Sequence, residues 1–432
     1  MPSPGRALYH LHSLGAAGVA PVNPDVDAAD PCDRGFRVLH GWLDHIVELG
    51  GGGVLLTPVF VSSTHGYDTV DPFRIDQRLG DDHDFDAFLE ACHSRGLEVI
   101  LDGVFNHVGR DHAAFRDVLA HGEASTFAEW FRLDFSRDDG DGFRYRTFDG
   151  HRELVALNHR SDAVLDWAEA VACHWLDRGV DGWRLDVAYA IPVPFLKDLT
   201  DRVHRQHPDA FIFGEMIHGD YAGFVSGTGL DSVTQYELYK AIWSSLNDAN
   251  FFELAWALER HRAFIPGFAP VTFVGNHDVT RIASQLHDPS HLAHAVTLLF
   301  TVPGVPCIYY GDELAWRGTK ENRPGGDDAI RQALPPSAEP ADEQQTWMRN
   351  LYQQLIALRR DRPWLTQGDI EVLDTASERI TYTVRAGDNA LLVTLDSAGS
   401  AVMPPPGWQP IASYPGIAIC ERLANAGDPA AT

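Results

Sequence analysis

The sequence lacks the features that mark several large classes of protein. Its five cysteines are scattered through 432 residues and never form a Cys-x-x-Cys pair, which fits reduced, buried thiols better than a disulfide framework or a zinc site. No apolar run reaches the roughly 18 residues of a membrane span. The N-terminal residues Met1–Arg6 are not followed by the apolar region of a signal peptide. We therefore expect a cytoplasmic protein.

Positive charge is also scarce. The chain has 34 Lys and Arg against 61 Asp and Glu, a formal net charge of −27. Binding to nucleic acid or to an anionic membrane needs clustered cations, so we expect neither partner. We interpret the negative charge as a feature that keeps the protein soluble. Hydrophobic residues make up 44% and charged residues 22%, as is ordinary for a globular protein. The length suits one large and one small domain, or about three average domains.

Helix and strand patterns alternate through most of the chain. Strands are expected at 7–12, 53–60, 97–102, 180–187, 210–215, 232–236, 271–274 and 305–310. Helical periodicity is found at 36–49, 84–89, 162–178, 194–207 and 291–300, and a further helix is expected to begin near Thr280. About eight strands separated by helices predict an α/β fold, the (β/α)8 TIM barrel. An open doubly wound sheet is the alternative, since its crossovers look the same in sequence.

Two segments depart from this alternation of helices and strands. Residues 108–158, rich in Phe, Asp, Gly and Arg, follow the third strand, where a long insertion is typical of a lid or small subdomain. After about Pro363 the runs 370–373, 380–384 and 390–394 are strand-like and separated by turn residues. They predict a small C-terminal antiparallel β domain.

Three carboxylates follow apolar strand-like runs. Asp186 lies in Gly-Trp-Arg-Leu-Asp-Val-Ala, Glu215 follows the strand expected at 210–215, and Asp278 ends Gly-Asn-His-Asp. In a TIM barrel the carboxyl ends of the strands form the active face. Cleavage of a glycosidic bond needs a carboxylate nucleophile and a carboxylic acid on opposite sides of one sugar carbon. The pattern therefore indicates glycoside cleavage.

Neighbouring residues suit this chemistry. Arg184 lies two residues before Asp186 on one strand, so both side chains point into the same space, and its charge would keep Asp186 ionised as a nucleophile requires. Glu215 has to hold a proton instead, which a partly desolvated site beside other carboxylates favours. Asp278 would stabilise the charged transition state or bind sugar hydroxyls. His107 and His277 are candidate hydrogen-bond donors to sugar hydroxyls, and Tyr67 can stack on a sugar ring.

Each of these residues also has a structural interpretation. A lone Asp at a strand end is commonly a cap or turn residue, a lone Arg a packing residue and a lone His a satisfied structural group. Together they all fall at strand ends on one expected face, which favours a site. His10, His12 and His65 fit no standard ligand spacing, so no catalytic metal is predicted.

Four blocks in order give the chain a resemblance to the α-amylase family, glycoside hydrolase family 13. They are Asp-Gly-Val-Phe-Asn-His at 102–107, Gly-Trp-Arg-Leu-Asp at 182–186, Gly-Glu at 214–215 and Asn-His-Asp at 276–278. Gly-Tyr-Asp at 66–68 and the segment 303–313 also match. The resemblance spans residues 7 to about 365 and implies a retaining glycoside hydrolase that acts by double displacement.

The resemblance assigns roles residue by residue. It makes Asp186 the nucleophile, Glu215 the acid/base and Asp278 the transition-state stabiliser. The residues it places around the glycosyl unit are Tyr67, His107, Arg184 and His277. It implies a barrel, domain A, at 1–107 and 159–365, an inserted domain B at 108–158, and domain C at 366–432.

Within the family, the chain resembles neopullulanases, cyclomaltodextrinases and maltogenic amylases. Val-Ala-Leu-Asn at 155–158 is similar to their Met-Pro-Lys-Leu-Asn block, and His218, a candidate substrate-binding residue, agrees with the group. Three features depart from it. The chain begins almost directly at the first barrel strand, without the group's N-terminal domain, which commonly mediates dimerisation. Ile217 replaces the Trp that precedes the His, and Tyr189-Ala190 replaces Asn-Glu.

These departures suggest a substrate other than ordinary cyclodextrin. We expect hydrolysis of α-1,4 bonds in small linear or cyclic gluco-oligosaccharides, such as cyclic α-maltosyl-(1→6)-maltose, with no cofactor required. A homodimer and a structural calcium stay open: Asn106 resembles a calcium ligand of other α-amylases, yet neopullulanase-type members often lack that site. One alternative is a transglycosylase or isomerase of the same family. An alternative of another class is a non-catalytic sugar-binding or assembly subunit, although such members typically lose the catalytic carboxylates.

Overall fold

The computed structural model describes residues 7–23, 26, 35–323 and 325–422. Cys32 and the tail from residue 423 fall outside this range. The chain divides into two compact units, which we describe in turn. The first is built mainly from residues 9–233 and 331–339, and the second mainly from 234–330 and the residues after Pro340. No helix in the described ranges is both long and apolar enough to cross a membrane.

The α/β part of the chain carries a parallel sheet of eight strands. The six strands of the first unit are β1 (Leu8–Leu11), β2 (Gly53–Leu56), β5 (Glu98–Gly103), β11 (Gly182–Leu185), β12 (Phe211–Gly214) and β13 (Ser232–Val233). Their spatial order is β13-β12-β11-β5-β2-β1. The second unit contributes β14 (Val271–Phe273) and β15 (Val305–Tyr309), which pair in parallel. Eight parallel strands with intervening helices confirm the predicted (β/α)8 barrel fold.

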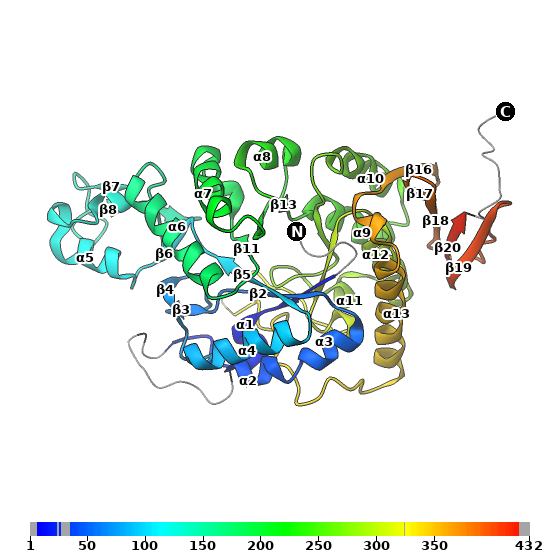
Figure 1. Ribbon diagram of the computed structural model, residues 1–432, viewed down its shortest axis with the longest axis horizontal. Coiled ribbons are helices and arrows are strands. Elements are labelled where there is room, and N and C mark those ends of the chain that lie inside the picture. The colour runs from blue at the N-terminus through cyan, green and yellow to red at the C-terminus, as the bar shows by residue number, and fades with distance from the viewer. Residues whose placement is uncertain (1–6, 24–25, 27–34, 324, 423–432) are drawn as a thin grey trace. The chain divides into compact units, whose positions relative to one another are not determined.

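Helices connect the strands of the first unit (Figure 1). They are α1 (Ser13–Ala17), α2 (Gly35–His40), α3 (Leu43–Leu49), α4 (Asp82–Ser94), α6 (Asp162–Asp177), α7 (Val193–Gln206) and α8 (Tyr221–Thr228). The single helix expected over 36–49 is wrong, because the chain breaks between α2 and α3. Gly41 lies at this break, and the buried Trp42 is held by a hydrogen bond from its indole Nε1–H to the Pro335 carbonyl at 3.1 Å.

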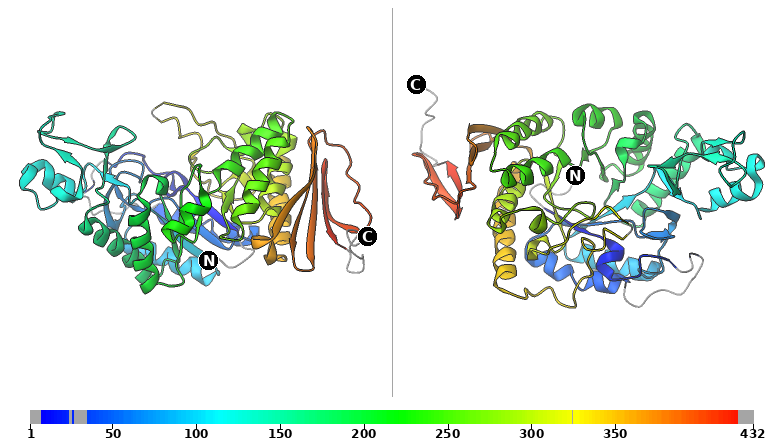
Figure 2. Two further views of the ribbon diagram at one scale, coloured as in Figure 1. Left: turned by 90° about the horizontal axis from the view of Figure 1, so that it is seen from above. Right: turned by 180° about the vertical axis from the view of Figure 1, so that it is seen from behind.

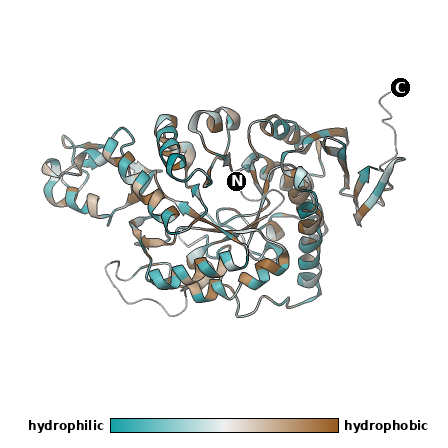
Figure 3. Cartoon of the chain, viewed as in Figure 1, coloured by the Kyte–Doolittle hydropathy of each residue, from teal (hydrophilic) through white to brown (hydrophobic). Residues whose placement is uncertain are grey.

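Alternating polarity explains how these helices pack. Figure 3 shows hydrophilic and hydrophobic stretches alternating along α4. Its apolar positions Phe85, Phe88 and Leu89 are buried, and its first turn is capped by the Asp81 carboxylate, which accepts the His83 and Asp84 N–H groups at 2.9 Å. The buried strands form the core that the helices cover.

The segment after β5 folds as a small structure of its own within the first unit. It contains β6 (His107–Gly109), α5 (Ala113–His121), β7 (Leu133–Asp134), β8 (Arg144–Tyr145), β9 (Thr147–Phe148) and β10 (His151–Ala156). β10 pairs antiparallel with both β6 and β9. Figure 1 shows α5, β7 and β8 together, beyond α6. Phe115, Phe131 and Tyr145 form its aromatic core, with ring centroids 4.9–5.1 Å from Phe115. A hairpin of β3 (Phe60–Ser62) and β4 (Thr69–Ile75) lies earlier in the chain.

The second unit combines helices with an antiparallel sheet (Figure 2). Its helices are α9 (Tyr236–Asn247), α10 (Phe252–Phe264), α11 (Ile282–Gln285), α12 (Leu292–Thr301) and α13 (Glu343–Arg360). The sheet follows the order β16 (Asp369–Thr375), β17 (Arg379–Ala386), β18 (Asn389–Asp396), β20 (Ile417–Arg422) and β19 (Trp408–Tyr414). The predicted C-terminal β domain is confirmed, with two strands more than expected. The helix expected near Thr280 is one short turn, α11.

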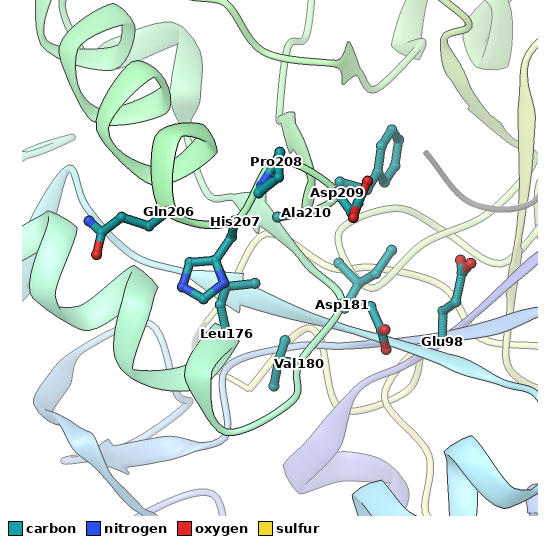
Figure 4. A pocket seen from close by; sticks show the side chains of 11 residues that line it. Glu98, Leu176, Val180, Asp181, Gln206, His207, Pro208, Asp209 and Ala210 are labelled. Carbon is teal, nitrogen blue, oxygen red and sulfur yellow. The ribbon is translucent and has the colours of Figure 1, made fainter.

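A cavity of about 460 Å³ lies at the amino ends of β5, β11 and β12 (Figure 4). Its polar lining includes Glu98, Asp181, His207 and Asp209. Asp181 is engaged in the fold, because its Oδ2 accepts the Val99 N–H at 2.7 Å. The amino ends of barrel strands generally serve stability and their carboxyl ends serve function. The active site is therefore expected at the carboxyl ends of these strands.

Buried histidines make the stability of the fold depend on pH. Burial lowers the pKa of His107, His112 and His261 to about 4. Each stays neutral in the fold while the unfolded chain takes up a proton below pH 6.5. Their stabilisation is therefore complete above pH 6.5 and is lost as the pH falls toward 4, at about 3 kcal/mol for each residue.

We predict that His112→Gln flattens the decline of the free energy of unfolding between pH 6.5 and 4, because one proton fewer separates the folded and unfolded states. Denaturant titrations across this range measure the slope. The matched control is His83→Gln on the exposed side of α4, which should keep the wild-type slope. Identical slopes for wild type and His112→Gln would contradict the prediction.

Candidate active site

The register of three neighbouring strands, β5, β11 and β12, brings the acidic residues of the candidate site in the first unit together. β11 pairs Arg184 with Asp102 of β5, and Leu185 with Gly214 of β12. Two further bonds continue the ladder past the strand ends: Asp186 N–H to the Gly103 carbonyl and Glu215 N–H to the Leu185 carbonyl, each 2.9 Å. Asp186 and Glu215 therefore lie at adjacent carboxyl ends, where the sequence placed them.

Arg184 links three carboxylates. Its Nη1 lies 2.5 Å from Asp102 Oδ2 and 3.3 Å from Asp186 Oδ1, and its Nη2 lies 3.2 Å from Glu215 Oε2. The residue is 4% exposed. Burial disfavours its charge, but the carboxylates of Asp102, Glu215 and Asp186 outweigh burial and hold the pKa of the guanidinium well above its usual value. Arg184 is thus a permanent cation beneath both catalytic candidates.

This contact differs from the sequence-based expectation in one respect. Arg184 was expected to favour the ionised form of Asp186 alone, yet it touches both Asp186 and Glu215. The ion pair by itself therefore does not separate the roles of the two carboxylates. The difference between them has to come from their other contacts.

Tyr67 reaches the same group of charges from the β3–β4 loop. Its hydroxyl donates to Asp102 Oδ2 at 3.1 Å, so Asp102 receives both Tyr67 and Arg184 on one oxygen. Gly66, immediately before it, has φ of +100°, a conformation that glycine adopts without strain. The half-buried ring of Tyr67 is therefore fixed at its hydroxyl end.

His107 is buried beside Tyr67. Its Nε2 lies 3.2 Å from the Tyr67 carbonyl and its Nδ1 lies 3.1 Å from Asn106 Nδ2. Phe148 of the insertion stacks on the imidazole, with ring centroids 5.1 Å apart and planes 7° apart. Burial lowers the pKa of His107 to about 4, so the ring is neutral near pH 7, with one nitrogen that donates and one that accepts.

The turn after Asp186 holds Glu215. Val187 has φ of +44° and ψ of +37°, a left-handed conformation that costs a β-branched residue about 1–3 kcal/mol. In this conformation its backbone N–H donates to Glu215 Oε2 at 2.9 Å. The chain then forms a short 3₁₀ turn, Ala188–Ala190. Gly214 leaves room for that turn, because a Cβ there would lie 2.8 Å from the Ala188 Cβ.

Apolar side chains follow the two carboxylates along the chain. Tyr189 is 42% exposed, and its N–H donates to the Glu215 carbonyl at 3.3 Å. Ile217, two residues after Glu215, is 39% exposed. The predicted His218 is exposed in the same loop. The loops after β11 and β12 thus present a tyrosine and an isoleucine to solvent.

The other two predicted residues belong to the second unit and lie together after β14. His277 is buried, with its Nε2 3.0 Å from Asp278 Oδ2, and the Asp278 side chain is 34% exposed. The Asp278 N–H donates to Asn276 Oδ1 at 2.8 Å, and the Asn276 amide donates to the Tyr236 hydroxyl at 2.8 Å. The loop 275–278 is therefore held by its own asparagine.

A buried ion pair packs beneath this loop. Arg281 Nη1 lies 3.0 Å from Asp312 Oδ1, and both residues are at most 1% exposed. Burial raises the pKa of Asp312 to about 7 despite the opposing effect of Arg281. Gly275 contacts Asp312 closely, since a Cβ at 275 would lie 2.3 Å from Asp312 Oδ2. The loop can follow this path only with glycine at 275.

The described residues contain no group of three or more His, Cys, Asp or Glu side chains arranged to hold a metal. Asn106, which resembles a calcium ligand of other α-amylases, directs its side-chain amide nitrogen toward His107. Its backbone carbonyl accepts the Leu157 N–H at 3.1 Å. Both groups serve the junction between the barrel and the insertion.

Three residues that contribute to this geometry were not among the site residues predicted from the sequence. Asp102 carried a usable signal, because it ends an apolar strand within the block that contains His107. Val187 carried none, since its left-handed conformation contradicts the preference of a β-branched residue. Phe148 lies in an insertion without clear periodicity, and only the pairing of β10 with β6 and β9 brings it to His107.

Comparison with known proteins agrees with this geometry. The profile of the family "Alpha amylase, catalytic domain" matches residues 39–348, and the chain belongs to the α-amylase family. A cyclomaltodextrinase from a Bacillus species is 32% identical over 373 residues, which are 83% of this chain and 65% of that protein. The chain thus spans just under two thirds of the length of this relative.

Two further proteins bear on function. The ligand-free cyclic alpha-maltosyl-(1→6)-maltose hydrolase from Arthrobacter globiformis matches with a TM-score of 0.79 and 28% identity over 91% of each chain. A 4-alpha-glucanotransferase from Thermotoga neapolitana is 32% identical over 310 residues, which are 66% of this chain and 68% of that protein. The first is a hydrolase of a small cyclic sugar, and the second is a transferase.

We predict that Asp102→Asn weakens the fold and the activity together. It leaves Arg184 with one buried countercharge fewer, which should lower the free energy of unfolding by about 3 kcal/mol. A displaced guanidinium should also lower kcat at least tenfold, or about 100-fold for a shift near 1 Å. Denaturant titration and initial rates on maltotriose measure the two effects. The control is Asp82→Asn in an exposed pair with Arg178, which should cost less than about 1 kcal/mol. Wild-type values for Asp102→Asn would refute the role of the ion pair.

We predict that Gly275→Ala displaces the loop that carries His277 and Asp278. The new Cβ would lie 2.3 Å from Asp312 Oδ2, a contact that the buried pair cannot relieve cheaply. Activity should fall at least tenfold by misplacement of the loop, with a lower melting temperature. Gly267→Ala is the matched control, because its Cβ would meet nothing nearer than the Phe264 carbonyl at 3.4 Å. Equal activities for the two variants would argue against this packing constraint.

Proposed function

We propose that this chain is a retaining α-glucoside hydrolase that cleaves α-1,4 bonds in small linear or cyclic gluco-oligosaccharides. The observation that carries the proposal is the buried Arg184, which contacts Asp186 and Glu215 at the ends of adjacent barrel strands. Two carboxylates in this setting suit a nucleophile and an acid/base. The similarity to cyclomaltodextrinase and to the cyclic maltosyl-maltose hydrolase supports the substrate class.

The mechanism we propose has two steps. Glu215 gives its proton to the glycosidic oxygen as the bond from that oxygen to C1 breaks, and an Asp186 oxygen forms a bond to C1. Water then attacks C1, Glu215 takes a water proton, and the bond from C1 to Asp186 breaks, which releases the sugar with its anomeric configuration retained. Asp278 of the second unit is the third carboxylate, which stabilises the positive charge at C1. This assignment is supported by its place after a barrel strand and by the family motif.

We propose that Tyr67 and His107 bind the glycosyl unit. The tyrosine ring is fixed through Asp102, and the neutral imidazole is fixed by Phe148 and Asn106. His277 of the second unit completes the set on the strength of the motif alone. In this scheme 108–158 acts as inserted domain B, and Phe148 is its contribution to the site.

The leaving-group side is where we expect preference for small substrates. Tyr189 and Ile217 are exposed shortly after Asp186 and Glu215 in the chain, and the Tyr189 N–H donates to the Glu215 carbonyl. A tyrosine ring stacks on a sugar, whereas isoleucine offers only apolar contact. We propose that this pair, with the exposed His218, receives one or two glucosyl units of a compact ring such as cyclic α-maltosyl-(1→6)-maltose.

The glucanotransferase similarity supports a second candidate, transfer of the glycosyl unit to another sugar in place of water. Both reactions share the first step and differ in the acceptor of the second. Product analysis of purified protein on maltodextrins, pullulan, cyclodextrins and mixed-linkage cyclic tetrasaccharides distinguishes them. Hydrolysis gives shorter products at every sugar concentration, and transfer gives longer or isomeric products at high concentration. Rapid cleavage of polymeric starch with untouched small sugars would contradict the proposed substrate class.

We predict that Glu215→Gln lowers kcat on maltotriose by about 10²–10⁴-fold, because the amide cannot donate the proton that the leaving group needs. The first step on α-maltosyl fluoride should be spared, since fluoride leaves with little proton assistance. Asp186→Asn should abolish both reactions, because it removes the nucleophile. Initial rates on maltotriose and the pre-steady-state release of fluoride from α-maltosyl fluoride measure the contrast. Unchanged turnover of maltotriose by Glu215→Gln would refute Glu215 as the acid/base, whereas absence of turnover in the wild-type protein would favour a sugar-binding or assembly subunit.

A further inference from the structure

Val187 occupies an uncommon backbone conformation next to the proposed nucleophile. Four non-glycine residues in the described ranges have positive φ: Asp149, Val187, Ala249 and Ala315. Val187 is the β-branched member of this group, and its side chain is 5% exposed. A β-branched residue in this region is a conformational outlier that the surrounding structure must impose. Such outliers cluster at functional sites.

Because of the left-handed turn, the backbone N–H groups of Asp186 and Val187 donate to different parts of the structure. The Asp186 N–H still continues the sheet, bonding the Gly103 carbonyl at 2.9 Å. The next N–H, that of Val187, leaves the sheet and donates to Glu215 Oε2 at 2.9 Å. The Val187 carbonyl then accepts the Ala190 N–H at 2.8 Å. The dipeptide Asp186–Val187 thus carries the proposed nucleophile and donates a hydrogen bond to the proposed acid/base.

Glu215 Oε2 faces two positively polarised groups. The Val187 N–H donates to it, and Arg184 Nη2 lies 3.2 Å away. An oxygen in this position acts as an acceptor, because a proton on it would point at one of the two donors. The proton of the acid form then belongs on the other oxygen, Oε1.

We propose that the Val187 N–H is a positioning donor that fixes Glu215 Oε2 as the acceptor oxygen and assigns proton transfer to Oε1. This inference rests on the proposed function of Glu215 as acid/base. The proton leaves Oε1 for the glycosidic oxygen in the first step, and a water proton returns to Oε1 in the second. The Val187 N–H therefore distinguishes the two oxygens of Glu215 from each other, a distinction that contact with Arg184 alone does not make.

The test removes this single donor by replacing Val187 with its α-hydroxy analogue, which turns the backbone N–H into an ester oxygen. A hydrogen bond to a carboxylate favours its ionised form. The alkaline limb of the kcat/KM profile should therefore move to higher pH, by about one unit. Turnover of maltotriose should fall roughly 10- to 100-fold by loss of acid/base efficiency. Among the described residues Arg184 forms an ion pair with Glu215, Asp102 and Asp186 contact the same guanidinium, and the substitution leaves all three in place.

Two controls separate positioning from general damage. An ester at Ile191 removes a backbone N–H from the same turn, one that donates to the Ala188 carbonyl at 3.1 Å, without touching Glu215. Val187→Gly keeps the donor and relieves the backbone outlier. Both should keep the wild-type alkaline limb. The first step on α-maltosyl fluoride, measured as the pre-steady-state release of fluoride, should also survive in the Val187 ester, because that step needs little proton donation.

An unmoved alkaline limb in the Val187 ester, or an equal shift in the Ile191 ester, would overturn the inference. A loss in first-step fluoride release equal to the loss in maltotriose turnover would overturn it as well. Wild-type protein that hydrolyses neither maltotriose nor the small cyclic oligosaccharides would instead refute the proposed function, so the two failures are distinguishable.

Discussion

The arrangement of the first unit depends on one buried positive charge. Arg184 is enclosed by protein, and three carboxylates from three adjacent strands surround its guanidinium. A buried cation without these partners would be strongly unfavourable, and so would the carboxylates without the cation. Strand register, ionisation and side-chain orientation are therefore mutually dependent: β5, β11 and β12 must align as they do for the charges to be compensated. Tyr67 and Val187 then attach their loops to this group of charges.

In the second unit a loop is also held above a buried, charge-compensated arginine, but by a different set of contacts. Its loop 275–278 is shaped by Asn276, which bonds forward to Asp278 and outward to Tyr236. Beneath it, Arg281 is flanked by aromatic rings, with Tyr309 and Tyr310 centroids at 4.6 and 5.1 Å from its guanidinium carbon, and Asp312 supplies the countercharge. In both units a buried arginine–aspartate pair underlies a carboxylate that follows a barrel strand.

Much of the fold could be predicted because periodicity and motif order are local properties. The strand ends that carry Asp186 and Glu215 are found from the apolar runs before them. Contacts set by tertiary structure could not be found in this way. The Asp102–Arg184 pair depends on the register between β5 and β11, and the left-handed Val187 opposes its own propensity. Helix α10 was missed because its surface exposes Phe252 and Trp256, which blurs the helical pattern.

The insertion leaves and rejoins the barrel at a single rung of a β ladder. His107 begins β6 and Ala156 ends β10, and these two residues are register partners. The two ends of the segment between them therefore lie side by side, and Trp130 within it packs on Trp167 of α6. A segment of another length could join the same pair of strand positions, and it would need an aromatic ring to replace the stacking of Phe148 on His107. Variation in substrate preference across such a family then has a natural, modular location in the chain.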